Sequence, residues 1–479
     1  MPSPAEPDTP PPAPAPQGPD APVLPGADSA PPGAAGAPGD DAATSRTARR
    51  ELAATGFFRL WTGESASLVG SQVTLFALPL VAVLVLDASA WEMGLLGAAG
   101  SLAVLLFGPS IGAWVDRMDR RSAMQTANVL RCLLLLLVPA AYLLDALHLW
   151  LLLLVAFAVG GLSLLFDTAM AGYVPALVGR RLVAANSWMQ STVSVSDTAG
   201  PGLAGALVQV LGAPLAILAD AASYLVSMTA LQRLPKAPPG EAEEEQTHFR
   251  AVAAGFLLVL RDRVQRPMML AATHFNLFTA MFFAVYMLYL IKVLGFSPLA
   301  VGLLNVAGGL TGLLGAWISS RVAERFGYGT VLTVVYAIPG VAALLVPAAQ
   351  LFDGPLPAVL VGASTALWSF SVTVNLILSE TIKQALVPSG MLGRVTSVIR
   401  VTSWGVEPVG SLLGGAIASS ALGLRYTLVL AGAGVFTSMF WTLFSRVRSL
   451  RVLPEEPVGD LAVEQGEEQR ESYGLAKER

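Results

Sequence analysis

The 479-residue chain has few of the side chains from which soluble enzymes build their sites. It holds one cysteine, Cys132, and three histidines, His148, His248 and His274. One cysteine cannot form an intramolecular disulfide, and the histidines are too widely spaced for a common metal-ligand motif. A phosphate-binding loop of the form Gly-x-x-x-x-Gly-Lys-Ser/Thr is also missing. These absences argue against a disulfide scaffold, a metalloenzyme and an ATP-driven pump.

Charge is scarce as well. Charged residues make up 13% of the chain and hydrophobic residues 54%, with a mean hydropathy of +0.63. A soluble protein carries about 25% charged residues. Apolar runs of ~20 residues recur along the sequence, which is the length that crosses a bilayer. The composition therefore predicts an integral membrane protein.

The hydrophobic pattern predicts twelve spanning helices in two sets of six. The first set covers about 57–86, 91–115, 123–144, 149–172, 187–211 and 214–231. The second covers about 268–293, 298–320, 330–350, 356–383, 394–419 and 423–445. This pattern gives two six-helix bundles, at 55–233 and 267–446, with a polar linker at 234–266 whose second half is predicted to be an amphipathic surface helix. The tails at 1–48 and 454–479 are predicted to be disordered.

Positive charge is concentrated on one side of the predicted spans. Arginines occur in the N-terminal flank, in the loops after spans two, four, six and eight, and in the C-terminal flank. The opposite loops carry Asp87, Glu92, Asp145 and Asp353, with Lys292 and Arg425 as their cations. Because Lys and Arg stay in cytoplasmic loops, both termini are expected in the cytoplasm. Arginine far outnumbers lysine, which together with the Ala, Gly and Pro enrichment suggests a GC-rich bacterium, so a bacterial cytoplasmic membrane is expected.

The two halves also look like copies of one another. Gly112-Ala-Trp-Val-Asp116 after span two has a counterpart in Gly315-Ala-Trp-Ile-Ser319 after span eight. Ala176-Leu-Val178 before span five matches Ala385-Leu-Val387 before span eleven. Parallel repeats of six spans are an architecture of secondary transporters, in which the binding site lies between the halves near the bilayer midplane.

The stretch Gly112-Ala-Trp-Val-Asp-Arg-Met-Asp-Arg-Arg121 resembles the signature loop of the major facilitator superfamily, with Asp119 where glycine is commonest. Phe57-Phe-Arg-Leu-Trp61 and Asp220-Ala-Ala-Ser-Tyr224 are similar to the bacterial drug and siderophore exporter branch. The resemblance implies an all-α integral membrane fold of twelve transmembrane helices in two pseudo-symmetric bundles. It also implies that the loop forms a cytoplasmic gate from Gly112, Asp116, Arg117, Arg120 and Arg121, with the acid meeting the start of helix eleven. The alternative is that these charges only fix topology.

Span five contains Gly200-Pro201-Gly202-Leu-Ala-Gly205, which resembles the antiporter motif of the same family, although Ala206 replaces its final glycine. A functional motif would consist of Gly200, Pro201 and Gly205. The alternative is a kinked packing seam, since small residues allow close helix approach and proline bends a helix.

Three carboxylates within predicted spans are candidates for proton coupling or substrate binding: Glu64, Asp197 and Glu407. An ionisable group in the membrane is costly and is by default a functional hypothesis. Asp197 and Glu407 occupy similar depths in the two halves, each beside a proline-containing segment. The alternative for this pair is a structural hydrogen bond or salt bridge, for instance with Arg400 or Arg131. Asp167 and Glu380 are expected to pair with loop arginines, and Asp220 is expected to cap a helix.

Aromatic side chains recur at helical spacing in span seven. A substrate cavity is predicted from Phe278, Phe282, Tyr286 and Trp404, and the alternative is ordinary packing.

Taken together, the sequence predicts a non-enzymatic secondary transporter that exports a lipophilic or drug-like small molecule in exchange for protons. It is expected to act as a monomer in the lipid bilayer, powered by the proton gradient, with no cofactor, no metal and no nucleic acid. Competing hypotheses are a proton-coupled uptake permease for a small nutrient, a membrane-embedded enzyme and a non-transporting signalling protein.

Overall fold

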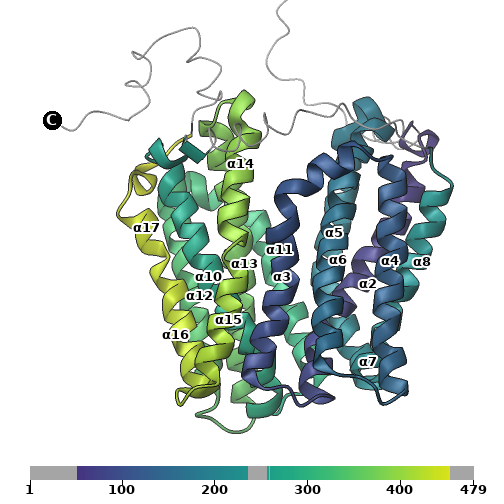
Figure 1. Ribbon diagram of the computed structural model, residues 1–479. Coiled ribbons are helices and arrows are strands. Elements are labelled where there is room, and N and C mark those ends of the chain that lie inside the picture. The colour runs from purple at the N-terminus through teal and green to yellow at the C-terminus, as the bar shows by residue number, and fades with distance from the viewer. Residues whose placement is uncertain (1–50, 236–255, 258, 454–479) are drawn as a thin grey trace, which may run out of the picture. The chain divides into compact units, whose positions relative to one another are not determined.

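A computed structural model describes residues 51–235, 256–257 and 259–453, and every long regular element among them is a helix. The first half of the chain (Figure 1) forms α2 (Phe57–Leu84), α3 (Ala90–Asp116), α4 (Arg120–Leu143), α5 (Leu149–Val178), α6 (Leu182–Leu211), α7 (Ala213–Ala216) and α8 (Leu218–Gln232). The second half forms α10 (Gln265–Leu288), α11 (Pro298–Phe326), α12 (Tyr328–Ala349), α13 (Leu356–Leu386), α14 (Ser389–Trp404), α15 (Glu407–Ala418), α16 (Gly423–Thr437) and α17 (Met439–Leu443).

The helices account for the predicted spans. Ten helical segments of the described chain are long and apolar enough to cross a membrane. One of them, Leu149–Leu211, contains two crossings, α5 and α6, joined by the short 3-10 turn η1 (Gly179–Arg181). α14 and α15 follow one another as a further interrupted crossing. The arrangement is consistent with twelve crossings in two six-helix bundles.

Several helices differ from the predicted spans at their ends and at internal breaks. α5 extends to Val178 and α6 begins at Leu182, whereas the predicted spans ended at residue 172 and began at 187. Hydropathy underestimates helices that continue past the hydrocarbon region into polar surroundings. Span eleven is interrupted between Trp404 and Glu407, where Pro408 lies at the start of α15 and has no backbone N–H for a continuous helix.

Parts of the predicted domain organisation fall outside the described residues. These parts are the tails at 1–48 and 454–479 and most of the linker, including the first turns of its predicted amphipathic helix. The described end of the linker is helical at residues 259–261, and Val259 packs against Val387, Val395 and Val398. The linker therefore rejoins the second half beside the first turns of span eleven.

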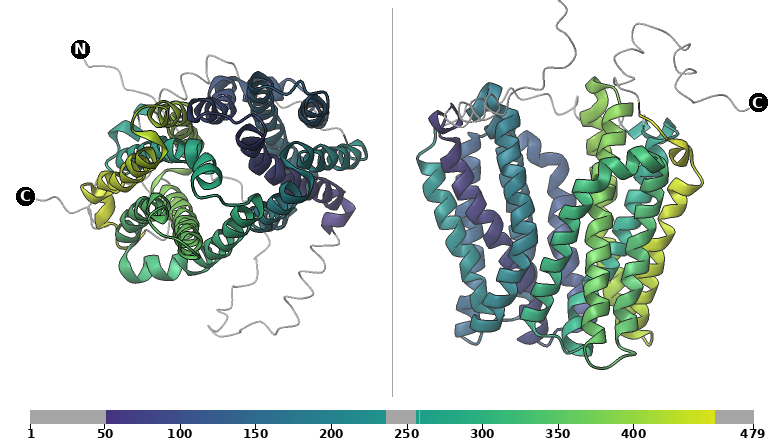
Figure 2. Two further views of the ribbon diagram at one scale, coloured as in Figure 1. Left: turned by 90° about the horizontal axis from the view of Figure 1, so that it is seen from below. Right: turned by 180° about the vertical axis from the view of Figure 1, so that it is seen from behind.

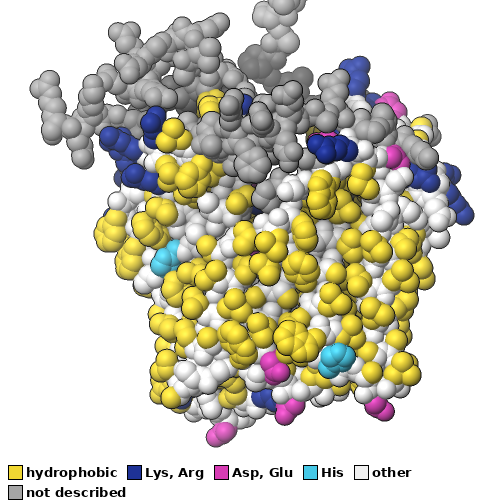
Figure 3. Space-filling view, viewed as in Figure 1, with side chains coloured by type: hydrophobic (Ala, Val, Ile, Leu, Met, Phe, Trp, Pro, Cys, Tyr) yellow, Lys and Arg dark blue, Asp and Glu magenta, His cyan; other side chains and the backbone are white. Residues whose placement is uncertain are grey.

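We call the end of the helices that carries Arg117, Arg180 and Arg446 the arginine end, and the end that carries Asp87, Asp145 and Asp353 the acid end. Between them lies a belt of exposed apolar side chains, visible in Figure 3. Large apolar side chains that are mostly exposed in the described chain include Leu75, Trp150 and Val210. Such a belt facing outward is expected where lipid tails surround the protein. Lys and Arg side chains collect above the belt, and Asp and Glu side chains are visible below it.

The two halves touch through two helix crossings that depend on glycine. α3 packs on α15, and a methyl group placed on Gly94 would lie 2.8 Å from the Gly415 Cα. α6 packs on α11, and a methyl group on Gly205 would lie 3.1 Å from the Gly302 Cα. Both crossings are close to the acid end, which is the lower end in Figure 1 and is seen from behind in Figure 2. Small residues permit this approach because no side chain separates the backbones.

Candidate functional site

A cavity of about 880 Å³ lies among α2, α5 and α6 of the first half. Glu64 from α2 and Asp167 from α5 line it, together with the polar α6 side chains Asn186, Gln190 and Ser194. Glu64 is only 5% exposed, and its Oε2 has no hydrogen-bond partner within the described part of the chain. A buried carboxylate oxygen without a donor is costly when charged, so this site can accommodate a proton or a cationic group.

Arg131 on α4 is the positive group at the centre of this bundle, and it is 4% exposed. Its guanidinium lies over the rings of Phe166 and Tyr224, at 4.6 and 4.5 Å from their centroids. It donates hydrogen bonds to Asn128 Oδ1 and, at 3.3 Å, to Ser163 Oγ. Planar stacking between two aromatic rings holds the guanidinium at a fixed depth and orientation.

Three carboxylates lie within electrostatic range of this arginine, although none of them forms an ion pair with it among the described residues. Glu64, Asp167 and Asp220 all interact electrostatically with Arg131, and Asp167 also interacts with Arg400 of the second half. Thus three negatively charged groups in this cluster have two positively charged neighbours, Arg131 and Arg400. Because each charge in the membrane is expensive unless compensated, the cluster has a deficit of positive charge that a proton or a cationic ligand can supply.

Asp220 is held most tightly of the three. It is 1% exposed and accepts a 2.5 Å hydrogen bond from Thr74 Oγ1 of α2, while Ser223 Oγ donates to its Oδ1 at 3.1 Å. It lies in the first turn of α8, but the N-cap of that helix is Ile217 and no side chain caps it, so the expected capping role is wrong. Its main partner is on another helix. Asp220 therefore ties α8 to α2 across the bundle.

The other two candidate carboxylates lie apart from this cavity, and each has its own partner. Asp197 on α6 accepts a 2.6 Å hydrogen bond from Gln72 Nε2 of α2, within the first half. Glu407 on α15 accepts a 3.0 Å hydrogen bond from Ser101 Oγ of α3, which joins the two halves. Both contacts are hydrogen bonds of the kind that the structural alternative names. An ion pair of Asp197 or Glu407 with Arg131 or Arg400 is not among the ion pairs of the described chain.

At the acid end an exposed ion pair links the two halves. Lys292, in the π-helical turn η2 (Tyr289–Val293), pairs with Asp87 in the loop between α2 and α3. The hydrogen bond from Lys292 lowers the pKa of the exposed Asp87 carboxyl from its ordinary value, with their charge attraction as a further cause. Asp87 therefore stays ionised at lower pH than an isolated aspartate, and the pair persists in mildly acidic medium.

The halves are less closely packed toward the arginine end. Gly108 and Gly112 on α3 and Gly393 on α14 have open space where a side chain would begin, with no described atom within 4 Å. α3 bends away from α14 toward this end in Figure 1, although the two halves stay together at the acid end. The described close contacts between the halves therefore lie toward the acid end, and α3 and α14 diverge toward the arginine end.

The signature loop is anchored to its own half. Asp116 pairs with Arg120 at 3.5 Å, and Arg120 also donates to the carbonyl oxygen of Gly172 on α5. Arg121 donates to the carbonyl oxygen of Gln232 at the end of α8. Arg117 is exposed and ends α3. The predicted contact between the acid and the start of helix eleven is not among the described interactions, and it remains a prediction for a state in which this end is closed.

Asp119, which departs from the common form of the motif, has a local structural role. Its carboxylate accepts hydrogen bonds from the Ser122 backbone N–H at 3.1 Å and from the Ser122 hydroxyl. It is the N-cap of α4, a position at which aspartate is favoured over most residues because it satisfies a free helix N–H.

The antiporter-like motif lies at the crossing between the halves. A methyl group on Gly205 would lie 2.7 Å from the Pro298 carbonyl oxygen, and one on Gly302 would lie 2.5 Å from the Pro201 carbonyl oxygen. Gly200 faces the Gln72 side chain instead, at 2.6 Å from such a methyl group. In this motif Gly205 packs against α11, while Gly200 packs against Gln72, whose side chain donates a hydrogen bond to Asp197.

The aromatic residues of span seven form a packed cluster in the second half. Phe282 stacks on Tyr286 at 5.2 Å and on Trp368 of α13 at 5.5 Å between ring centroids. Phe278 contacts His274 and faces Gly434, while Trp404 lies below the guanidinium of Arg400 at 5.4 Å. The structure does not bring these four predicted cavity residues into one group. The substrate cavity they were proposed to form remains a prediction.

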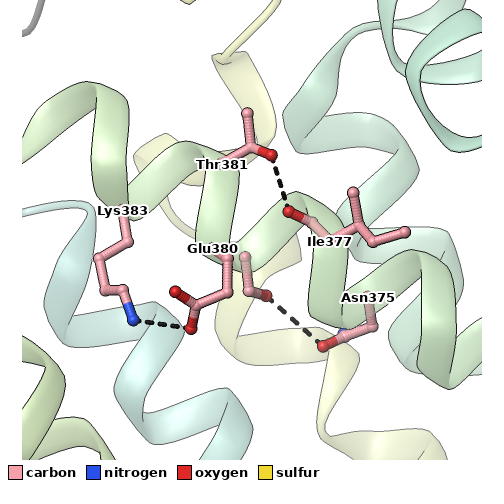
Figure 4. Close-up of polar contacts among 6 residues, drawn as sticks. Asn375, Ile377, Glu380, Thr381 and Lys383 are labelled. Carbon is pink, nitrogen blue, oxygen red and sulfur yellow. Dashed lines mark hydrogen bonds and ion pairs between the residues drawn. The ribbon is translucent and has the colours of Figure 1, made fainter. Parts of the chain in front are cut away.

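Glu380 lies on α13 with Asn375, Thr381 and Lys383 (Figure 4). Its carboxylate accepts a 2.7 Å contact from Lys383 Nζ, one turn further along the same helix. The expected pairing with a loop arginine is therefore replaced by a lysine on the same helix. A carboxylate that is already paired in this way is a poor candidate for proton exchange.

The sequence placed Glu64, Asp197 and Glu407 among the candidates and offered Arg131 only as a partner of Asp197 or Glu407. It did not connect Arg131 with Glu64, Asp167 and Asp220. The available signal was a single arginine among the apolar residues of span three, which the cost of a charge in the membrane marks as functional. Asp167 was also assigned to loop arginines, whereas its positive neighbours Arg131 and Arg400 lie within spans.

Comparison with known proteins agrees with this architecture. The Major Facilitator Superfamily profile matches residues 60–406. The multidrug efflux pump Tap of Mycolicibacterium fortuitum is 28% identical over 382 residues, which cover 75% of this chain and 88% of Tap. Macrolide efflux protein A of Streptococcus pyogenes is 24% identical over 393 residues, covering 78% and 92%.

Solved structures show the same fold. A bacterial homologue of the iron transporter ferroportin in an inward-facing state superimposes with a TM-score of 0.66 at 16% identity, covering 81% of this chain and 98% of that one. The nucleoside transporter NupG gives 0.65 at 13% identity, with the same coverage of both chains. The family profile covers most of the chain, and its members are membrane transporters rather than enzymes. This chain therefore belongs to the major facilitator superfamily.

Proposed function

We propose that the protein is a proton-coupled exporter of lipophilic or drug-like small molecules that works by alternating access. The observation that carries the proposal is the group of three carboxylates, Glu64, Asp167 and Asp220, that shares two arginines beside a cavity in the first half. A proton, or the cationic group of a substrate, supplies the missing positive charge. Exchange of one for the other would couple the two fluxes. Export is supported by the relatives, which are a multidrug efflux pump and a macrolide efflux protein.

We further infer that the arginine end faces the cytoplasm of a bacterial cell, with both termini on that side. The ion pair of Asp87 with Lys292 and the glycine crossings then close the periplasmic or outer side, and the parted arginine end corresponds to an inward-facing state. The two bundles at 55–233 and 267–446 act as the moving units, the linker at 234–266 joins them, and one chain is the functional unit. No cofactor is required, because the proton gradient supplies the energy.

The coupling proposal predicts the behaviour of Asp197→Asn and Glu407→Gln. Both amides retain an oxygen that accepts the hydrogen bond from Gln72 or Ser101, so the substitutions remove only the titratable charge. We expect each variant to reduce efflux driven by a pH gradient by roughly tenfold, equivalent to ~1.4 kcal/mol. The measurement is substrate efflux from inverted vesicles, with and without a protonophore.

The control for this pair is Asp145→Asn. Asp145 lies in the loop between α4 and α5 with a φ of 51°, a conformation that asparagine also adopts readily. Gradient-driven efflux by the Asp145→Asn variant is expected to equal that of the unmodified protein. Normal gradient-driven efflux in both Asp197→Asn and Glu407→Gln would exclude these residues as coupling sites, and efflux indifferent to the gradient would exclude proton coupling itself.

The signature loop makes a separate prediction. In the structure described here, Asp116→Asn removes the half-exposed ion pair with Arg120. In the proposed state with a closed cytoplasmic gate, it removes the carboxylate that would hold the gate shut. An exposed pair of this kind contributes about 0.2–1 kcal/mol, so transport should fall by up to about fivefold. Membrane insertion, measured with reporter fusions at both ends of the chain, should be unchanged. A variant that inserts and also transports at the normal rate would limit the loop to fixing topology.

A further inference from the structure

A second cavity, of about 830 Å³, lies at the arginine end of the second half, far along the chain from the carboxylate cluster. Its walls come from the start of α10, from α17 and from the 3-10 turn η3 (Arg446–Ser449). Arg263, Arg266 and Arg446 line it on one side, and Phe440, Trp441 and Phe444 line it on the other. We call this cavity the arginine–aromatic groove.

The charges of the groove are uncompensated within the described residues. All three arginines are exposed, and none of them makes an ion pair there. No acidic residue is among the lining residues. The adjacent Asp262 is directed to the backbone instead, since its carboxylate accepts 2.7 Å hydrogen bonds from the N–H groups of Val264 and Gln265. The groove therefore presents three guanidinium groups to an anion.

The aromatic wall faces the surroundings of the protein. Phe444 is 82% exposed and stacks on Phe440, with 5.6 Å between the ring centroids. Trp441 is oriented by a 3.4 Å hydrogen bond from its indole Nε1 to His274 Nδ1. α17 lies on the outer side of the bundle in Figures 1 and 2, where an exposed phenylalanine meets lipid. Figure 3 shows Lys and Arg side chains gathered directly above apolar side chains on this flank.

We propose that the arginine–aromatic groove binds one anionic phospholipid of the surrounding leaflet. The phosphodiester would be held by the guanidinium groups, which match phosphate oxygens with paired N–H donors, and an acyl chain would lie over Phe440 and Phe444. Basic clefts between helices at the cytoplasmic surface suit anionic headgroups. A zwitterionic lipid fits less well, because its ammonium group would approach three positive charges. The bound lipid would join α10 to η3, and so the first and last helices of the second half.

The test uses the purified full-length protein in detergent, titrated with dioleoylphosphatidylglycerol, dioleoylphosphatidylcholine or inorganic phosphate, with bound lipid counted by native mass spectrometry. We expect saturable binding of about one phosphatidylglycerol and much weaker binding of phosphatidylcholine. In the triple variant Arg263→Gln, Arg266→Gln, Arg446→Gln, affinity for phosphatidylglycerol should fall roughly fivefold for each arginine, about a hundredfold in total. The paired substitution Arg321→Gln, Arg325→Gln, whose guanidiniums lie over Trp317 and Phe326, is the matched control and should bind normally.

A second variant guards against loss of folding in the triple mutant. Phe444→Ser keeps all three arginines and removes the most exposed part of the apolar wall, so phosphatidylglycerol binding should weaken while any binding of inorganic phosphate stays constant. Equal binding of the two lipids, or full binding by the triple variant, would overturn the proposal. Displacement of phosphatidylglycerol by millimolar phosphate would show a soluble-anion site instead, and a large gain in lipid binding after removal of residues 454–479 would show that the acidic tail is the occupant.

Discussion

Replacing Glu64 with glutamine should reduce gradient-driven efflux by about a hundredfold while leaving the protein folded in the membrane. Glu64 is the buried member of the acidic cavity, and one of its carboxylate oxygens has no donor within the described chain. Glutamine has the same shape but cannot exchange a proton or attract a cation. A charged side chain in the membrane differs from a neutral one by about 2.5–3.5 kcal/mol, which corresponds to a factor of roughly a hundred. That difference is the energy available for coupling at this position.

The experiment compares efflux in inverted vesicles with equilibrium exchange of labelled substrate in the absence of a gradient. Loss of coupling should abolish gradient-driven efflux. It should preserve much of the equilibrium exchange, since exchange requires alternating access but no net proton movement. Glu92→Gln is the control, because Glu92 forms the capping box of α3 with Ser89 and glutamine supports the same box. If Glu64→Gln accumulated substrate against its gradient as well as Glu92→Gln did, Glu64 would have no part in coupling.

A variant of the arginine in the same bundle would not separate these roles. Arg131 stacks between Phe166 and Tyr224 and also compensates three acids, so its removal leaves a packing defect together with uncompensated charge. Breaking a buried charge cluster in this way is strongly destabilising, by about 3–5 kcal/mol. The acid substitutions are informative because they leave the arginine stacked and change one charge at a time.

The sequence predicted the spans well because the membrane imposes a one-dimensional pattern. Each span needs a long apolar run, and the runs are separated by charges that hydrocarbon excludes, so twelve segments could be counted without knowing how they pack. The break before Glu407 was also foreshadowed by Pro408. The ends of α5 and α6 were placed several residues short, because helices that enter the polar interface are no longer marked by hydropathy.

Which side chains meet could not be predicted from such a pattern. Glu64 was recognised as a candidate in span one, but nothing in the pattern indicated that Thr74 of the same helix binds Asp220 at a separation of 146 residues. Periodicity tells which face of a helix is polar and says nothing of which helix lies opposite. Asp119 is a different case, since an aspartate directly before a helix is a recognisable N-cap signal, and its departure from the family motif could have been explained from the sequence.

Gly205→Ala should shift the protein away from the state described here, toward one that is open at the acid end. The added methyl group would lie 2.7 Å from the Pro298 carbonyl oxygen and 3.1 Å from the Gly302 Cα, both backbone atoms that cannot rotate away. The strain is relieved only when α6 and α11 separate, and these helices belong to opposite halves. Overpacking of this kind costs about 1–3 kcal/mol, so the ratio of the two states should change by roughly fivefold to more than a hundredfold.

Gly100→Ala provides the matched comparison, because a methyl group on Gly100 meets no described atom within 4 Å and alanine favours a helix over glycine. The shift can be measured by alkylation of a Val306→Cys reporter with a membrane-impermeant maleimide from the outer side, in a Cys132→Ala background. Val306 packs against Gly202 at the same crossing, so its thiol is protected while the halves are closed there. Faster labelling in Gly205→Ala but not in Gly100→Ala is the expected result. Equal rates would mean that α6 and α11 move together as one unit, and the antiporter-like motif would then be a packing seam whose glycines do not control which side of the membrane is open.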